Sequence, residues 1–249
     1  MSIIPIYSWN PYRECVTVVI PTILMCPKEI FNYTLTEFTN CEVVKEIIII
    51  DNTPDKRFDK EYTLTPKIKV VKPETNLGAC VNDGMDLITT EYYLITNDDV
   101  ACRGRIALCC FGIMEQDKEI GLIQVEQKVG QPLADYIKTP LKDTSYMFPP
   151  NPRACMTGWF HFGRTEEWEP IPTTLKYFYG DDLILDRMRL NKRKVARLAN
   201  DHVSHHMSSS VQHRNHTPDT HLAIQTEGVI YRQLVKDLEK RINEKNSVK

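Results

Sequence analysis

Short apolar runs alternate with segments of helical apolar spacing along the first half of the chain. The runs that predict strands are 16–20, 47–50, 68–71 and 92–96, and the segments that predict helices are 27–38 and 78–88. The run 47–50 consists of isoleucines with no polar residue between them, as in a strand that is buried on both faces. This strand–helix–strand rhythm predicts βαβ units and a mostly parallel central sheet flanked by helices.

The second half of the chain is less regular. Its helical patterns lie at 106–114 and 180–190, and its strand-like runs lie at 121–125 and 154–162. The proline-rich segment 132–152 is predicted to be an irregular loop over the functional site. The segment 202–216 is rich in His and Ser and has no periodicity. An amphipathic pattern over 218–246 predicts one long terminal helix.

Polar residues follow three of the predicted strands at the point where each strand ends. They are Pro21–Thr22, Asp51–Asn52 and Asn97–Asp98–Asp99. The carboxyl ends of parallel strands meet at one edge of a sheet, where α/β proteins bind their ligands. Two adjacent aspartates are costly to bury without a partner, and a divalent cation such as Mg²⁺ or Mn²⁺ is a natural one. From these residues alone, the alternative is a solvated turn that caps the next helix.

The composition is that of a folded globular domain. The 249 residues are 42% hydrophobic and 26% charged, which excludes disorder, collagen and coiled coil for the body of the chain. The 31 Lys and Arg stand against 33 Asp and Glu, and this net charge of -2 argues against binding nucleic acid over the whole surface. A local basic groove remains compatible with it.

The chain shows no sign of a membrane or secreted protein. No run approaches 18 consecutive apolar residues and the first residues lack a signal-peptide pattern, so we expect no membrane span and no secretion. The eight cysteines form no CxxC pair, which favours reduced thiols. We therefore expect a cytoplasmic protein, in the host cytoplasm if the chain is viral.

Six segments of the chain resemble, in order and spacing, the inverting GT-A glycosyltransferases of family 2 and their relatives. They are 16–22, 46–52, 76–84, 97–99, 180–182 and 205–210. In the family these positions hold the opening strand, a second strand whose Asp contacts the nucleotide base, an Asn-x-Gly segment, the DXD motif, the Glu-Asp element with the catalytic base, and a metal-binding His. The chain departs from the family in having Asp-Asn, Asn-Asp-Asp and Asp-Asp at the second, fourth and fifth segments.

This resemblance implies a GT-A fold, which is Rossmann-like, and a role for individual residues. It implies a Mn²⁺ or Mg²⁺ ion held by Asp99 with His205 or His206. It implies Asp182 as the catalytic base, with Asp181 as the second choice. The donor-binding residues that it implies are Pro21, Thr22, Asp51, Asn76, Gly78, Asn97 and Asp98. The acceptor-binding residues that it implies are Thr157, Gly158 and Trp159, although Trp159 is explained equally well as a core residue.

The implied reaction moves a hexosyl or pentosyl group from a nucleotide-sugar donor, a UDP-sugar first of all, to an acceptor hydroxyl with inversion. The acceptor is either a glycan or a modified base in viral DNA. A cation that bridges the phosphates stabilises the charge on the leaving diphosphate. A carboxylate within hydrogen-bond reach removes the proton of the attacking hydroxyl. We expect the catalytic domain to span 1–210, and a helical extension over 211–249 to pack on it or to make a homodimer contact.

Three alternatives stay open. A sugar nucleotidyltransferase uses a similar sheet, but the segment 22–28 lacks the glycines that hold a triphosphate. A zinc site would use the histidines between 202 and 216. A nucleic-acid-binding protein would use a cluster of basic residues. The other explanation of this cluster is a solvated helix face. The residues of that basic cluster are Arg187, Arg189, Lys192, Arg193, Lys194 and Arg197.

Overall fold

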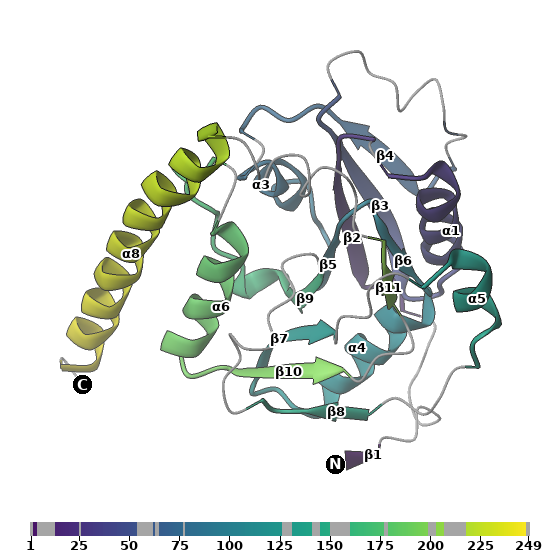
Figure 1. The fold of residues 1–249 in the computed structure, drawn as a ribbon. Coiled ribbons are helices and arrows are strands. Elements are labelled where there is room, and N and C mark those ends of the chain that lie inside the picture. Colours follow the sequence, from purple (N-terminus) through teal and green to yellow (C-terminus); the bar gives the residue numbers. More distant parts are fainter. Residues whose placement is uncertain are drawn as a thin grey trace.

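The computed structural model shows a twisted sheet between two layers of helices (Figure 1). It describes residues 2–3, 13–24, 26–53, 62, 65–76, 78–125, 131–140, 145–149, 160–176, 179–198, 203–206 and 218–247. Its helices are α1 (Lys28–Thr39), α3 (Val81–Met85), α4 (Arg105–Gln116), α5 (Leu133–Lys138), α6 (Gly180–Leu190) and α8 (Pro218–Ser247), with the 3-10 turn η3 (Thr165–Glu167). Within these residues no helix is both long enough and apolar enough to cross a membrane.

The main sheet has nine strands within the described ranges, in the order β1-β8-β10-β7-β9-β5-β2-β3-β4. They are β1 (Ser2–Ile3), β8 (Ser145–Met147), β10 (Lys194–Leu198), β7 (Ile120–Val125), β9 (Phe160–Arg164), β5 (Tyr92–Thr96), β2 (Val16–Thr22), β3 (Val44–Asp51) and β4 (Ile68–Val71). A second sheet pairs β6 (Val100–Cys102) with β11 (Val203–His205) in antiparallel fashion. The sheet is mostly parallel, because only β8 and β9 run against their neighbours.

The strand order reverses at β2. After β2, the strand β3 pairs with one side of β2, and β4 pairs with the far side of β3. The chain then returns, and β5 pairs with the other side of β2. In open α/β sheets such a switch point leaves a crevice beyond the carboxyl ends of the strands, and ligands bind there. The predicted polar strand ends after β2, β3 and β5 all lie at this edge.

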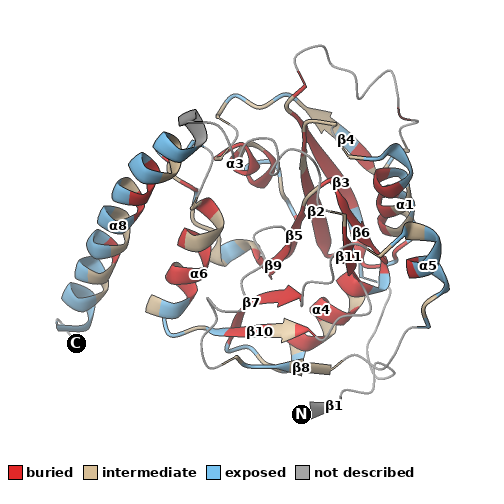
Figure 2. Cartoon of the chain, in the orientation of Figure 1, coloured by how far each residue is buried: buried red, intermediate tan, exposed pale blue. Residues whose placement is uncertain are grey.

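The core lies on both faces of the sheet, and the isoleucine run explains why. Ile47 and Ile49 pack into one apolar cluster with α1 and α4, whereas Ile48 and Ile50 pack into the other with α3, α6 and α8. All four side chains have no exposed surface, which confirms the prediction of a strand buried on both faces. Figure 2 shows the same pattern, with buried residues along the central strands and exposed ones on the outer sides of the helices.

Several predicted elements coincide with the structure and two need correction. The strands at 68–71 and 92–96 and the helix at 180–190 have the predicted bounds. The helix predicted at 78–88 is helical only over α3, because residues 78–80 and 86–87 form turns on either side of it. The segment 132–152 is not an irregular loop, since it contains α5 and β8.

The correction at 132–152 has a tertiary cause. The Arg103 guanidinium donates hydrogen bonds to the carbonyl oxygens of Tyr136 (2.5 Å) and Thr139 (2.7 Å), and it lies 4.9 Å from the Tyr136 ring. The Tyr136 side chain is buried. A short proline-preceded segment thus becomes helical because a distant arginine binds its end. Strand β8 exists because it pairs with β10.

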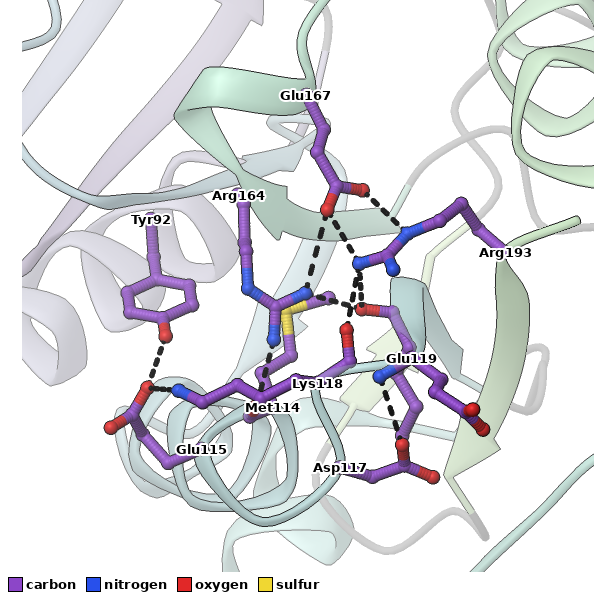
Figure 3. A network of polar contacts seen from close by, with 10 residues as sticks. Tyr92, Met114, Glu115, Asp117, Lys118, Glu119, Arg164, Glu167 and Arg193 are labelled. Carbon is purple, nitrogen blue, oxygen red and sulfur yellow. Dashed lines mark hydrogen bonds and ion pairs between the residues drawn. The ribbon is translucent and has the colours of Figure 1, made fainter. Parts of the chain in front are cut away.

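A polar network closes the opposite edge of the sheet, where the parallel strands begin (Figure 3). Arg164 is buried and donates to the carbonyl oxygens of Ile120 (2.5 Å) and Met114 (2.8 Å). Arg193 pairs with the Glu167 carboxylate at 2.5 Å and also donates to the Ile120 carbonyl at 3.3 Å. The network joins α4, β7, β9 and the turn before β10, so it stabilises the fold away from the strand-end crevice.

Candidate active site

Thr22 and Asp98 join the two strands that flank the switch point. The Thr22 hydroxyl donates to Asp98 Oδ2 at 2.5 Å and accepts from the Leu24 N–H at 2.9 Å. The Asn52 N–H donates to the Thr22 carbonyl at 2.9 Å, which ties in the end of β3. Burial, with a smaller contribution from the neighbouring Asp99, outweighs the hydrogen bond from Thr22 and raises the pKa of Asp98 to about 6. These contacts fix a carboxyl group at the carboxyl ends of the strands beside the switch point.

Asp51 is also buried at this edge, at the end of β3. Its Oδ1 accepts the Thr53 N–H at 2.9 Å and the Thr53 hydroxyl at 2.5 Å, and Lys72 Nζ lies 3.2 Å from its Oδ2. The carboxylate therefore shapes the turn that follows β3. Its role in binding a nucleotide base stays a prediction.

Asp99 meets the two histidines because β6 pairs with β11. The register places His205 opposite Val100, and His205 Nε2 lies 3.4 Å from Asp99 Oδ2. The His206 N–H donates to the Asp99 carbonyl at 2.8 Å. Burial and the adjacent His205 lower the pKa of His206, which favours the neutral imidazole that metals bind. Its Nε2 atom is buried and has no hydrogen-bond partner among the described residues.

The carboxylate and imidazole groups of this cluster fit a hard divalent cation that is also coordinated by a bound phosphate. The described residues contain no group of three or more His, Cys, Asp or Glu side chains that could hold a metal by themselves. Asp99 and His205 supply one carboxylate and one imidazole. Mg²⁺ and similar ions commonly take one or two protein ligands and complete their shell with phosphate oxygens and water. The pair therefore fits such an ion better than a closed structural zinc site, which has four protein ligands.

Asp181 and Asp182 lie in the first turn of α6, and both are half-buried. The segment 171–176 that leads to this turn is held by the region around α3. The Asn82 side chain donates to the Ile171 carbonyl (2.8 Å) and accepts the Ile171 N–H (2.9 Å), as a paired strand would. Asn82 had no individual role in the sequence-based prediction, because both the burial of its side chain and this contact depend on the tertiary structure.

Asn76 and Gly78 hold the same segment. The Asn76 amide donates to the Thr173 carbonyl at 2.6 Å, and the Gly78 N–H donates to the Lys176 carbonyl at 2.6 Å. A Cβ at position 78 would lie 2.5 Å from the Leu175 carbonyl oxygen, so only glycine fits. The structure thus gives both residues a positioning contact, and their predicted contact with a donor stays a prediction.

The remaining predicted residues have different outcomes. Pro21 and Asn97 are half-buried at the ends of β2 and β5, beside Thr22 and Asp98. Thr157, Gly158 and Trp159 lie outside the described residues, so the acceptor side of the crevice stays a prediction. Seven of the eight cysteines lie within the described part of the chain, and no disulfide joins any two of these seven.

Most of the basic cluster is paired with carboxylates. Arg189 contacts Asp186 at 3.2 Å, and Lys194 contacts Glu119 at 2.5 Å and Asp117 at 3.1 Å. Arg187 likewise pairs with Glu169, and Arg193 pairs with Glu167 in the network of Figure 3. Cations that are already neutralised attract phosphates less, so this surface is a poor candidate for binding nucleic acid.

The strand order, the switch point and the flanking helices together define the GT-A glycosyltransferase fold. Solved structures of TarS from S. aureus share it. The chain matches TarS 1-349 with a TM-score of 0.55 and 15% identity, over 84% of this chain and 65% of that chain. It matches the complex of TarS 1-349 with UDP-GlcNAc with a TM-score of 0.58 and 14% identity, over 78% of this chain and 58% of that chain.

A third match, TarS 1-349 in complex with UDP, has a TM-score of 0.56 and 15% identity and covers 78% of this chain and 61% of that chain. The chain therefore spans about three fifths of the length of these structures. At this identity the likeness establishes the fold. No family model and no curated protein matches the sequence.

Proposed function

We propose that this protein is a glycosyltransferase that moves a sugar from a nucleoside-diphosphate donor, most simply a UDP-sugar, to an acceptor hydroxyl. One observation carries the proposal: at the switch point of a GT-A sheet, Asp98 is fixed by Thr22 and Asp99 faces His205 at 3.4 Å. The matching TarS structures that contain UDP and UDP-GlcNAc support the choice of donor.

The donor diphosphate lies, in this proposal, over the carboxyl ends of β2 and β5. Asp99 and His205 would hold Mn²⁺ or Mg²⁺ there, with His206 as a further candidate ligand. When bound, the ion supplies charge stabilisation to the leaving diphosphate. Thr22 and Asp98 keep the floor of the crevice in place, because their hydrogen bond joins the two strands below it.

The acceptor hydroxyl is deprotonated by a carboxylate from the first turn of α6. Asp182 is the first choice and Asp181 the second. A single base that acts from the face opposite the leaving group produces inversion in one displacement. Asn76, Gly78 and Asn82 contribute indirectly, because they fix the segment from which α6 begins.

A glycan acceptor is favoured over duplex DNA. The cations of the basic cluster that pair with carboxylates have little charge left for a phosphate backbone. A glycan presents neutral hydroxyls and needs no such surface. The absence of a mobility shift with duplex DNA at low salt is the expected result, and tight salt-dependent binding would reverse this preference.

The proposal is tested with a panel of nucleotide sugars and Mn²⁺, in which release of the nucleoside diphosphate is measured. We expect turnover of at least one donor and a loss of about 100-fold or more in Asp182→Asn or Asp181→Asn, whichever is the base. Asp237→Asn is the matched control, because Asp237 is exposed on α8, where its carboxylate accepts a hydrogen bond from Gln233 of the same helix. Absence of turnover together with absence of donor binding by calorimetry would refute the proposal.

A further inference from the structure

The residue before the α6 carboxylates has an unusual backbone. Tyr179 has φ 64°, in the left-handed region, and it directly precedes Gly180, Asp181 and Asp182. Non-glycine residues seldom adopt this conformation and persist in it only where the surroundings hold them. The direction in which α6 begins, and with it the position of both carboxylates, depends on this turn.

Helix α8 holds the Tyr179 side chain. The Tyr179 ring stacks on the Tyr231 ring, with centroids 5.1 Å apart and an interplanar angle of 12°. Its hydroxyl donates to the Ile224 carbonyl at 3.3 Å. Gly228 leaves the space for this hydroxyl, because a Cβ at that position would lie 3.1 Å from it. Three successive turns of one helix therefore contact a single tyrosine.

Tyr231 is itself fixed by α6. Its hydroxyl donates to Asp186 Oδ2, and Asp186 is fully buried. Arg189 Nε lies 3.2 Å from Asp186 Oδ1, and the same arginine reaches Glu239 of α8 at 3.6 Å. Burying the Asp186 carboxylate is costly unless it is paired, and both partners supply that pairing. The contacts form a closed loop from Tyr179 to α8 and back to α6.

Helix α8 lies beside α6, on the side away from the central strands (Figure 1). Its outer side is exposed over residues 221–247 (Figure 2). It thus packs against the helix that begins with the candidate base. Within the described part of the chain, no hydrogen bond or ion pair joins α8 to the predicted donor residues on β2, β3 and β5.

We propose that Tyr179 and Tyr231 are positioning residues for the α6 carboxylates, so that α8 is a brace for the catalytic base. The inference rests on the proposed function, because it requires that Asp181 or Asp182 is the catalytic base. Loss of the brace lets the first turn of α6 shift. Misplacement of a catalytic group by about 1 Å lowers the rate by up to about 100-fold, whereas the donor site at the strand ends is unchanged.

The test compares Tyr231→Ala, which removes the stack and the hydrogen bond, with Tyr231→Phe, which keeps the stack. We expect Tyr231→Ala to lower kcat about 10- to 100-fold with a donor dissociation constant within about twofold of wild type. Tyr231→Phe should regain most of kcat. Val229→Ala is the matched control, because Val229 is exposed on the same helix, and its kcat should equal that of wild type.

Hydrogen–deuterium exchange of residues 180–184 gives a readout that does not depend on activity. We expect faster exchange there in Tyr231→Ala than in Val229→Ala, with unchanged exchange in β2 and β5. Unchanged exchange at 180–184, or a Tyr231→Ala protein with wild-type kcat, would overturn the brace while leaving the proposed function intact. A wild-type protein that turns over no donor would instead overturn the proposed function, and the brace with it.

Discussion

Gly78 offers the sharpest test of how the candidate base is held. In Gly78→Ala, the new Cβ would lie 2.5 Å from the Leu175 carbonyl oxygen and 2.6 Å from the Lys176 carbonyl carbon. Both are backbone atoms, so the strain can be relieved only if the segment 171–176 moves away. That movement breaks the 2.6 Å hydrogen bond from the Gly78 N–H to the Lys176 carbonyl.

The magnitude follows from these two effects. Overpacking of this kind costs about 1–3 kcal/mol, and a lost backbone hydrogen bond costs about 1 kcal/mol. Because the segment lies near the surface and can shift, we expect a total of about 2 kcal/mol, which lowers the melting temperature of a chain of this length by about 4–8 °C. The displaced segment carries the start of α6 with it, so kcat should fall about 10- to 100-fold.

Thermal unfolding, urea unfolding and steady-state kinetics check this prediction in parallel. Lys176→Ala is the control, because it removes an exposed side chain and leaves the backbone contact in place. Its stability should lie within about 0.5 kcal/mol of wild type. Wild-type stability and kcat in Gly78→Ala would show that the segment 171–176 tolerates a large displacement, and that it does not set the position of α6.

Three further predictions concern other parts of the molecule. Arg164→Met should destabilise the protein by about 3 kcal/mol in urea unfolding, because it removes the hydrogen bonds that the buried guanidinium donates to the Ile120 and Met114 carbonyl oxygens (Figure 3); a loss below 1 kcal/mol would contradict this. Burial acts to raise the pKa of Glu115, but the hydrogen bonds from Lys118 and Tyr92 outweigh it and lower that pKa. The free energy of unfolding should therefore fall as the pH drops below the usual glutamate range, and it should fall less in Glu115→Gln. Chelation should abolish sugar transfer, and Asp99→Asn should weaken Mn²⁺ binding measured by calorimetry at least about 10-fold; equal binding would exclude Asp99 as a ligand.

Much of the fold was predictable because its signals are local. The isoleucines 47–50 predict a strand buried on both faces, and the helix at 180–190 has the bounds that its apolar spacing indicates. The strand-end residues Thr22, Asp51 and Asp98 were also found by a local rule, since parallel strands bring their carboxyl ends together. The structure places all three at one edge of the sheet.

The remaining elements depend on contacts that no local pattern contains. Strands β6 and β11 have three residues each and exist because they pair with each other across about a hundred residues of chain. Helix α5 depends on hydrogen bonds from Arg103. Tyr179 was missed because nothing in its neighbours indicates a left-handed backbone, which is held by Tyr231 from a different helix.

The pairing of β6 with β11 also decides when the candidate cation pair can form. Asp99 leaves the ribosome about a hundred residues before His205, and only β11 brings the two within 3.4 Å. A nascent chain can assemble β2, β3, β4 and β5 much earlier, because their contacts are closer in sequence. The sheet can thus fold while the candidate cation pair is still incomplete, and the pair forms only after β11 has been synthesised and has paired with β6.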